Sequence, residues 1–165
     1  MPLPVSLEAA LLDVAEAVRG AREPWWIIGS AAVALHGAEA GEIGDIDLLM
    51  SRGDAGRLFA RRGLPLAPGP GGPLFRSALL GRWSAAGREV EAMAGLEVCG
   101  ARGWVQVLPR GRAAVAVAGA TLFVPPRDEL VAILRLFGRE KDLARAAALE
   151  AAGRPRDWTE PPPRG

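Results

Sequence analysis

The chain has 165 residues, of which 50% are hydrophobic and 24% charged, and its formal net charge is +1. That length and apolar content suit one domain with a substantial core, and the near balance of charges gives no sign of a surface built for nucleic acid or an anionic membrane. No apolar run is long enough to cross a bilayer, and the N-terminal segment lacks the basic start and long apolar middle of a signal peptide. Cys99 is the only cysteine, which excludes an internal disulfide and fits a reducing compartment. We therefore expect a cytoplasmic protein with no membrane partner.

The N-terminal part of the chain alternates between helical and strand patterns. Ser6 is a candidate N-cap for the first helix, and Gly37 a candidate C-terminal stop for the second. The predicted elements are, in chain order, a helix over 6–19, a strand over 25–28, a helix over 31–36, a strand over 46–50 and a helix over 54–62.

The rest of the chain is richer in strands and ends in two helices. Residues 63–73 are Gly- and Pro-rich, which predicts a mobile loop or a lid. Residues 153–165 predict a flexible Pro- and Arg-rich tail, which leaves 1–152 as a single domain. The predicted elements are strands over 74–84, 88–94, 103–108, 113–117 and 121–124, and helices over 128–137 and 140–152 that Gly138 separates. This order indicates an α/β or α+β sheet with helices packed on it.

Two aspartates stand one residue apart in an otherwise apolar strand. In a strand, Asp45 and Asp47 project from the same face. Two carboxylates about 4 Å apart repel by roughly 4 kcal/mol at an effective dielectric near 20. A divalent cation such as Mg²⁺, which prefers carboxylate oxygens, would offset that repulsion. The alternative is that Asp45 caps a turn while Asp47 lies alone at a strand edge.

A Gly-Ser pair stands earlier, where the strand over 25–28 gives way to a helix. Free N–H groups at such a point attract phosphate, Gly29 allows an anion to approach the backbone, and the Ser30 hydroxyl can bond to it. The alternative makes Ser30 an ordinary N-cap and Gly29 an ordinary turn residue. Together with the aspartate pair, the Gly-Ser pair indicates a site for a nucleoside triphosphate.

The stretch "IIGSAAVALHG" followed by "DIDLLM" resembles the signature of the nucleotidyltransferase superfamily, whose members share the polymerase β-like fold. The similarity is closest to the minimal nucleotidyltransferase-like proteins of bacteria and archaea. It implies a mixed β-sheet flanked by helices, with a C-terminal helix pair. It also implies a third carboxylate from a later strand, for which Glu91 in "REVEAMA" is the candidate and Glu89 the alternative. If neither serves, both glutamates are solvated on an edge strand.

The segment "GREKDLARAAAL" resembles a basic helical segment of the same family. The resemblance implies that Arg139 and Lys141 hold the triphosphate tail. The alternative is a surface ion pair of Lys141 or Arg145 with Asp142, while a further reading has Asp142 orienting an arginine. The chain departs from the family in "AEAGEIG", which lacks the basic or hydroxyl residue common before the first aspartate and adds Glu42. It departs again in having glutamate as the third carboxylate.

The resemblance implies a nucleotidyltransferase that depends on Mg²⁺ or Mn²⁺ and transfers a nucleoside monophosphate from a nucleoside triphosphate to an unidentified acceptor. The catalytic metal ligands would be Asp45, Asp47 and Glu91, and the nucleotide-binding residues Gly29, Ser30, Arg139 and Lys141. The acceptor would be a protein, an RNA or a small molecule, held by a partner protein or between the subunits of a homo-oligomer. One alternative is a catalytically degraded binding or regulatory module, as in a toxin–antitoxin or defence system. Another, resting on the arginines alone, is an RNA-binding structural protein.

Overall fold

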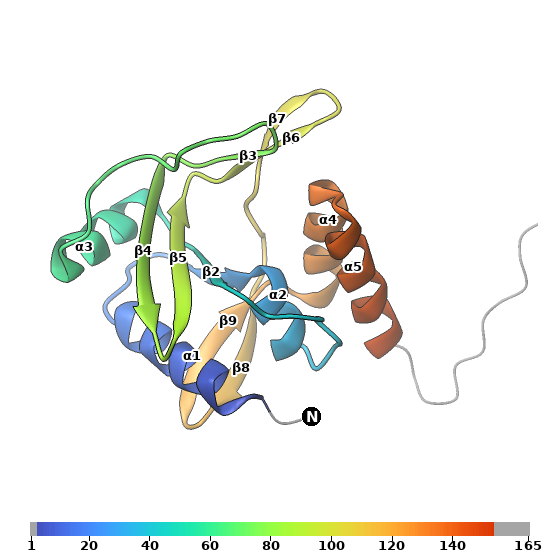
Figure 1. Cartoon of the computed structure of the whole chain (residues 1–165), viewed down its shortest axis with the longest axis horizontal. Helices are drawn as coiled ribbons and strands as arrows, with labels where there is room; N and C mark the ends of the chain where they lie inside the picture. Colours follow the sequence, from blue (N-terminus) through green and yellow to red (C-terminus); the bar gives the residue numbers. More distant parts are fainter. Residues whose placement is uncertain (1–2, 154–165) are drawn as a thin grey trace, which may run out of the picture.

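The computed structural model of the chain describes residues 3–153, which form five helices and nine strands (Figure 1). Apart from Gly153, the predicted tail over 153–165 lies outside the described residues. The N-terminal elements are α1 (Val5–Ala17), β1 (Trp26–Ile28), α2 (Gly29–Leu35), β2 (Ile46–Leu49) and α3 (Arg52–Arg62). The later strands are β3 (Phe75–Arg76), β4 (Leu79–Ala85), β5 (Arg88–Ala94), β6 (Glu97–Gly100), β7 (Gly103–Gln106), β8 (Ala113–Val117) and β9 (Ala120–Val124). The chain continues into α4 (Arg127–Phe137) and α5 (Glu140–Ala152).

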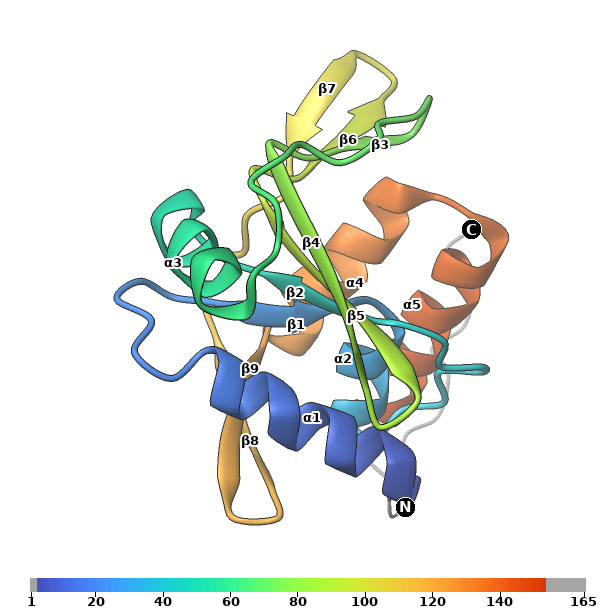
Figure 2. The same cartoon turned by 60° about the vertical axis from the view of Figure 1, so that its left-hand side comes forward.

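The central sheet has four strands in the order β1-β2-β5-β4. The two inner strands, β2 and β5, are parallel, and each outer strand pairs antiparallel with its neighbour. The predicted mixed sheet flanked by helices is therefore confirmed. Two smaller antiparallel sheets accompany it: β3-β6-β7 at one end and the hairpin β8-β9 at the other (Figures 1 and 2).

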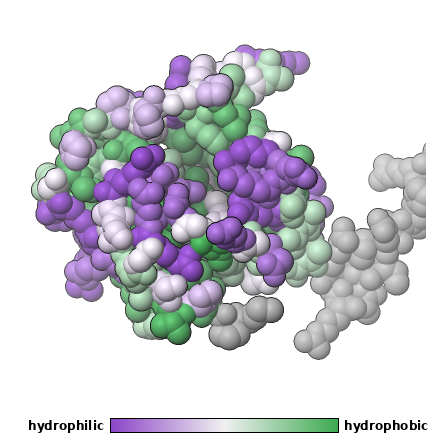
Figure 3. Space-filling model, in the orientation of Figure 1, coloured by the Kyte–Doolittle hydropathy of each residue, from purple (hydrophilic) through white to green (hydrophobic). Residues whose placement is uncertain are grey.

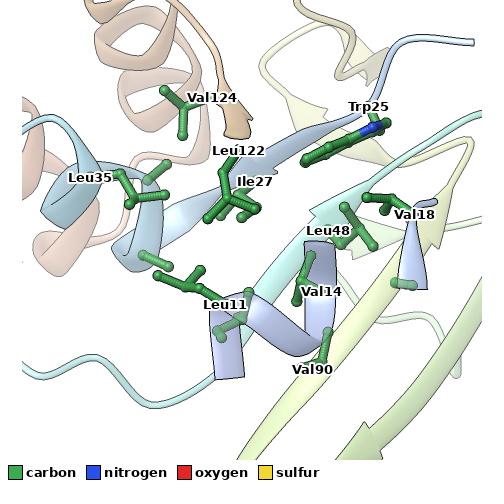
Figure 4. Close-up of a cluster of buried hydrophobic side chains, with 14 of the residues drawn as sticks. Leu11, Val14, Val18, Trp25, Ile27, Leu35, Leu48, Val90, Leu122 and Val124 are labelled. Atoms are coloured by element: carbon green, nitrogen blue, oxygen red, sulfur yellow. The ribbon is translucent and has the colours of Figure 1, made fainter. Parts of the chain in front are cut away.

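The main core lies on one face of the central sheet, where α1 covers it. Because side chains alternate along a strand, Ile46 and Leu48 of β2 and Val90 of β5 all point to this face and are fully buried. They belong to one cluster with Leu11 and Val14 of α1, and Figure 4 shows Leu48 and Val90 next to these two helix residues. Each such side chain contributes about 1.5–3 kcal/mol on burial, so this face holds the sheet and the helix together.

The opposite face is apolar at only one end of the sheet. There Leu49 and Met93 pack with Phe137 in a second, smaller core cluster beneath the sheet β3-β6-β7. Further along the same strands, on the same face, alternation places Asp47 and Glu91. On this face of the sheet, acidic side chains therefore lie next to the smaller apolar cluster.

The C-terminal helices form the predicted pair. Leu130 and Leu134 of α4 and Leu149 of α5 are fully buried. Gly138, with a φ of +72° that favours glycine, ends α4 and lets the chain turn into α5. Figures 1 and 2 show the pair beside α2, which places the start of α5 next to the acidic face of the sheet.

Three details of the predicted elements are wrong. The strand predicted over 74–84 is two strands, β3 and β4, which belong to different sheets. Strand β6 was not predicted, because its four residues show no clear alternation. The first helix begins at Val5 with Pro4 as its N-cap, so Ser6 lies inside the helix and does not cap it. Among the described residues, no helix combines the length and the apolar character needed to cross a membrane.

Candidate active site

A cleft of about 860 Å³ opens between the acidic face of the central sheet, α2, the start of α5 and β3. Figure 3 shows this face of the molecule hollowed, with hydrophilic side chains on both sides of the hollow. The seven residues that the sequence assigns to catalysis, metal binding or nucleotide binding all line the cleft: Gly29, Ser30, Asp45, Asp47, Glu91, Arg139 and Lys141. They come from β1–α2, from β2 and the loop before it, from β5 and from the start of α5. Glu89, the alternative third carboxylate, is not among the lining residues.

Strand register brings Gly29, Asp47 and Glu91 side by side. Asp47 pairs across β2–β5 with Glu91 and across β1–β2 with Ile28, the residue before Gly29. A Cβ on Gly29 would lie 2.6 Å from the Oδ2 of Asp47, and the φ of Gly29 is +69°. The positive φ favours glycine at this position, and any side chain there would have to displace the carboxylate of Asp47.

Ser30 lies in the first turn of α2 and is nearly buried. Ile28 is the N-cap of this helix, so the reading of Ser30 as an N-cap is wrong. No side chain caps the helix, which leaves the first N–H groups of α2 available to a ligand.

Burial and mutual repulsion disfavour the ionised forms of two carboxyl groups in the cleft, those of Asp47 and Glu91. Burial raises the pKa of Asp47 to about 7, and the nearby charges of Glu91 and Asp45 add to the rise, while Arg139 and Lys141 oppose it. The pKa of Glu91 is also raised, first by burial and then by Asp45 and Glu89, against the opposing charge of Arg82. A positive charge placed among these groups would be stabilised.

The tightest acidic group is formed by Asp45, Glu89 and Glu91, each of which offers an oxygen within 4.8 Å of the others. Oxygen ligands of Mg²⁺ or Ca²⁺ lie about 2.0–2.6 Å from the ion, so oxygens around one ion are separated by no more than about twice that distance. The spacing and the hard oxygen donors therefore fit a divalent cation. Both candidates for the third carboxylate belong to this group. Asp47 does not belong to it, although it pairs with Glu91 across β2–β5.

Arg82 is a cleft residue that the sequence analysis missed. Its Nε lies 3.1 Å from Oε1 of Glu91 and 3.8 Å from Oε1 of Glu89. The two-residue turn at Ala86–Gly87 sets this pairing, because it places Arg82 directly opposite Glu91 in the β4–β5 hairpin. Recognising "AAGR" as a hairpin turn would have predicted it.

The basic side of the cleft begins at the N-terminus of α5. Asp142, which is almost fully buried, accepts hydrogen bonds from Nε of Arg139 at 2.6 Å and from Nη2 at 3.1 Å. Asp142 therefore orients an arginine, as one reading of the sequence proposed, and the ion pair of Asp142 with Lys141 or Arg145 is wrong. Within the described part of the chain, Lys141 forms no ion pair, and its charge acts on Asp47.

Arg145 connects α5 to the loop that carries Asp45. Its Nε donates to the carbonyl oxygen of Ala40 at 2.8 Å, and its Nη2 donates to that of Glu42 at 3.1 Å. From the other side, Arg88 of β5 donates to the carbonyl oxygen of Ile43. Two arginines thus hold this glycine-containing loop by its backbone.

Comparison with solved structures identifies the fold. No family model matches the chain, and no curated protein matches it either. A Thermotoga maritima protein described as a candidate nucleotidyltransferase superposes with a TM-score of 0.63 at 20% identity, over 86% of this chain and 88% of that one. The antibiotic-resistance factor ANT(2″)-Ia, in its solution structure, superposes with a TM-score of 0.57 at 11% identity, over 91% and 85%.

The chain therefore has a nucleotidyltransferase-like fold, as the Gly-Ser and Asp-x-Asp motifs predict. The likeness extends over most of the chain.

Proposed function

We propose that the chain is a nucleotidyltransferase of the cytoplasm that depends on a divalent cation and transfers a nucleoside monophosphate from a nucleoside triphosphate to an acceptor. The observation that carries the proposal is the meeting of Asp45, Asp47 and Glu91 in one cleft, directly beside Gly29. Carboxylates bind a divalent cation, and a backbone segment without a side chain lets a phosphate approach its N–H groups, so the two ligands could bind side by side here.

Asp45, Asp47 and Glu91 would hold Mg²⁺ or Mn²⁺, with Glu89 as an additional or alternative ligand. Their oxygens are the donors that these ions prefer, and the raised pKa values of Asp47 and Glu91 indicate a surplus of negative charge there. A bound cation would neutralise phosphate charge and favour the ionised form of an acceptor hydroxyl.

The chain's own residues would bind and orient the triphosphate. The N–H groups at Gly29 and the hydroxyl of Ser30 would receive the β- and γ-phosphates, while Arg139 and Lys141 neutralise the tail. Asp142 fixes the plane of the Arg139 guanidinium, so little conformational freedom is lost on binding. The acceptor hydroxyl would release its proton to solvent, and its oxygen would bond to the α-phosphorus. The bond from the α-phosphorus to the oxygen that bridges it to the β-phosphorus would break, and pyrophosphate would leave with that oxygen.

The acceptor would be a small molecule, an RNA end or a side chain of a partner protein or of a second copy of the chain. The similarity to an antibiotic-resistance factor adds weight to a small molecule, and the cleft of about 860 Å³ lies in the size range of small-molecule sites.

A second candidate function is a binding or regulatory module that keeps the fold without catalysis, as in a toxin–antitoxin or defence system. The pairing of Arg82 with Glu91 favours this alternative, because a guanidinium already balances the third carboxylate. In this case the cleft would bind a nucleotide or a partner but would transfer nothing.

One experiment separates the two functions. The purified chain is incubated with each labelled nucleoside triphosphate, Mg²⁺ or Mn²⁺, and a cell extract that supplies acceptors. We expect label transfer that is lost in the double variant Asp45→Asn/Asp47→Asn and kept in Asp128→Asn, an exposed aspartate outside the cleft. Binding of a nucleotide without transfer under every condition would favour the regulatory module.

A further inference from the structure

Arg82 lies at the centre of β4 and faces the acidic group across the hairpin. Register places it opposite Glu91, with Ser84 opposite Glu89, so the guanidinium reaches both glutamates from one strand position. Its Nε is 3.1 Å from Glu91 and 3.8 Å from Glu89, and its side chain is 48% exposed. Arg82 also lines the cleft, so it has room to leave the glutamates without leaving the site.

The glutamate oxygens that contact Arg82 belong to the group that would hold a cation. Asp45, Glu89 and Glu91 bring their oxygens within 4.8 Å of one another, and Arg82 contacts two of these three residues. A guanidinium and a divalent cation at the same carboxylates repel each other, and each weakens the binding of the other. Water screens this repulsion in part, because the arginine is half exposed.

We propose that Arg82 is an internal counter-ion that competes with the divalent cation for Glu91 and Glu89, so that cation binding requires the guanidinium to move away. The inference rests on the cation site of the proposed function and adds a residue that tunes its affinity. With Arg82 in place, one guanidinium offsets part of the negative charge of the acidic group in the protein without a cation. With Arg82 displaced, its charge stays in the cleft beside Arg139 and Lys141, where a phosphate would bind.

The chain contains a closely matched control. Arg76 of β3 also lines the cleft, its side chain is also 48% exposed, and its Nε also lies 3.1 Å from a glutamate oxygen, that of Glu97. Glu97 is not part of the acidic group. Substituting Arg76 therefore removes an equivalent ion pair without removing a competitor for the cation.

The test is calorimetric titration of Mn²⁺ into the full-length chain near neutral pH, without nucleotide. We expect Arg82→Gln to bind Mn²⁺ about tenfold more tightly than the wild-type chain, and Arg76→Gln to bind it as the wild type does. Arg82→Met, which keeps the apolar part of the side chain, should show the same gain and serves if the glutamine variant does not fold. In the wild-type chain, Mg²⁺ should shift the NMR resonance of the Arg82 Nε–H and leave that of Arg76 unchanged.

The outcomes distinguish this inference from the proposed function. Equal or weaker Mn²⁺ binding by the folded Arg82 variants would overturn the competition and leave the nucleotidyltransferase proposal standing. Equal gains in the Arg82 and Arg76 variants would also overturn it, because a general change in charge would then explain the effect. If no variant and no wild-type chain bound Mn²⁺, both the cation site and the competition would be wrong.

Discussion

Gly29 and Asp47 are packed so closely that a Cβ at position 29 would lie 2.6 Å from the Oδ2 of Asp47 and would have to displace that carboxylate. The contact joins the two motifs that the sequence presents separately, since one belongs to the start of α2 and the other to β2. A phosphate bound at the backbone of Gly29 would therefore lie next to a carboxylate, and the two would need a cation between them.

Substituting Gly29 tests that contact. We expect Gly29→Ala to weaken Mn²⁺ binding at least tenfold and to lower the free energy of unfolding by more than about 2 kcal/mol, because strain at positive φ adds to the clash with Asp47. Gly37→Ala is the control, since Gly37 has a φ of +77° and open space around its Cβ position. That variant should lose only about 1 kcal/mol and keep its cation affinity. Equal losses in the two variants would mean that the contact with Asp47 is unimportant.

Asp47 should destabilise the protein when no cation is present and should allow Mg²⁺ to stabilise it. In EDTA, Asp47→Asn should unfold at a higher urea concentration than the wild type, because it removes one of several mutually repelling carboxylates. The expected gain in the free energy of unfolding is about 1 kcal/mol. With millimolar Mg²⁺ we expect the wild type alone to gain stability, since ligand binding stabilises only the folded state that binds it. The measurement is urea denaturation with and without Mg²⁺. A wild type indifferent to Mg²⁺ would contradict the expected site.

Asp54 predicts a pH dependence that has nothing to do with the cleft. Its buried carboxylate accepts hydrogen bonds from the backbone N–H groups of Arg22 and Glu23 and from the side chain of Arg57. Burial alone would raise the pKa of Asp54, but these hydrogen bonds outweigh it and lower the pKa. The stabilisation is therefore present above the unfolded-state pKa of about 3.9 and is lost as the pH falls through the lower pKa of the folded state.

Asp54→Asn should accordingly cost about 2–3 kcal/mol near neutral pH, and the difference from the wild type should shrink as the solution is acidified below about pH 4. Denaturation of both proteins across this pH range measures it. Asp128→Asn, at an exposed position in the first turn of α4, should lose less than about 1 kcal/mol at any pH in this range. A difference that does not change with pH would show that charge on Asp54 is not the stabilising element.

The loop before β2 should loosen when Arg145 is shortened. Arg145→Met removes the hydrogen bonds to the carbonyl oxygens of Ala40 and Glu42, so we expect faster amide hydrogen exchange over 38–45 and several-fold weaker Mn²⁺ binding. The control is Arg135→Met on α4, which removes an ion pair with Glu150 and no hydrogen bond to the loop. Unchanged exchange in the loop would indicate that Arg88 alone is enough to hold it.

A glycine in the β4–β5 turn should stabilise the protein. Ala86 has a φ of +49°, a left-handed conformation that costs a residue with a side chain about 1 kcal/mol relative to glycine. Ala86→Gly should therefore raise the free energy of unfolding by about 0.5–1 kcal/mol, measured by urea denaturation. Ala85→Gly, one position earlier in strand β4, should lower it. A loss of stability in Ala86→Gly would contradict the turn geometry.

The same turn shows where sequence reasoning reaches its limit. Helices α4 and α5 could be predicted from local signals, the apolar spacing and Gly138. The resemblance of the Gly-Ser and Asp-x-Asp motifs to a known family predicted seven residues that line one cleft. Arg82 could not be found in this way, because its role depends on register, and register depends on a turn in which alanine adopts a conformation typical of glycine or asparagine.

The division of the segment 74–84 was missed for a related reason. Its residues are apolar enough for one strand, but Phe75 and Arg76 pair with β6 while Leu79 onward pairs with β5. Which partner a strand takes is decided by the whole fold and not by the residues of the strand itself.

Asp47 and Glu91 stand on β2 and β5, the two inner strands of the central sheet, so each of these strands has hydrogen-bonded neighbours on both sides. These strands should be the last part of the molecule to open, whereas the cleft wall formed by β3 belongs to a separate small sheet at the rim. The carboxylates and the rim of the cleft thus belong to parts of the fold that can change independently. Substitutions in the rim can alter what the cleft accepts while the central sheet that carries the carboxylates is retained.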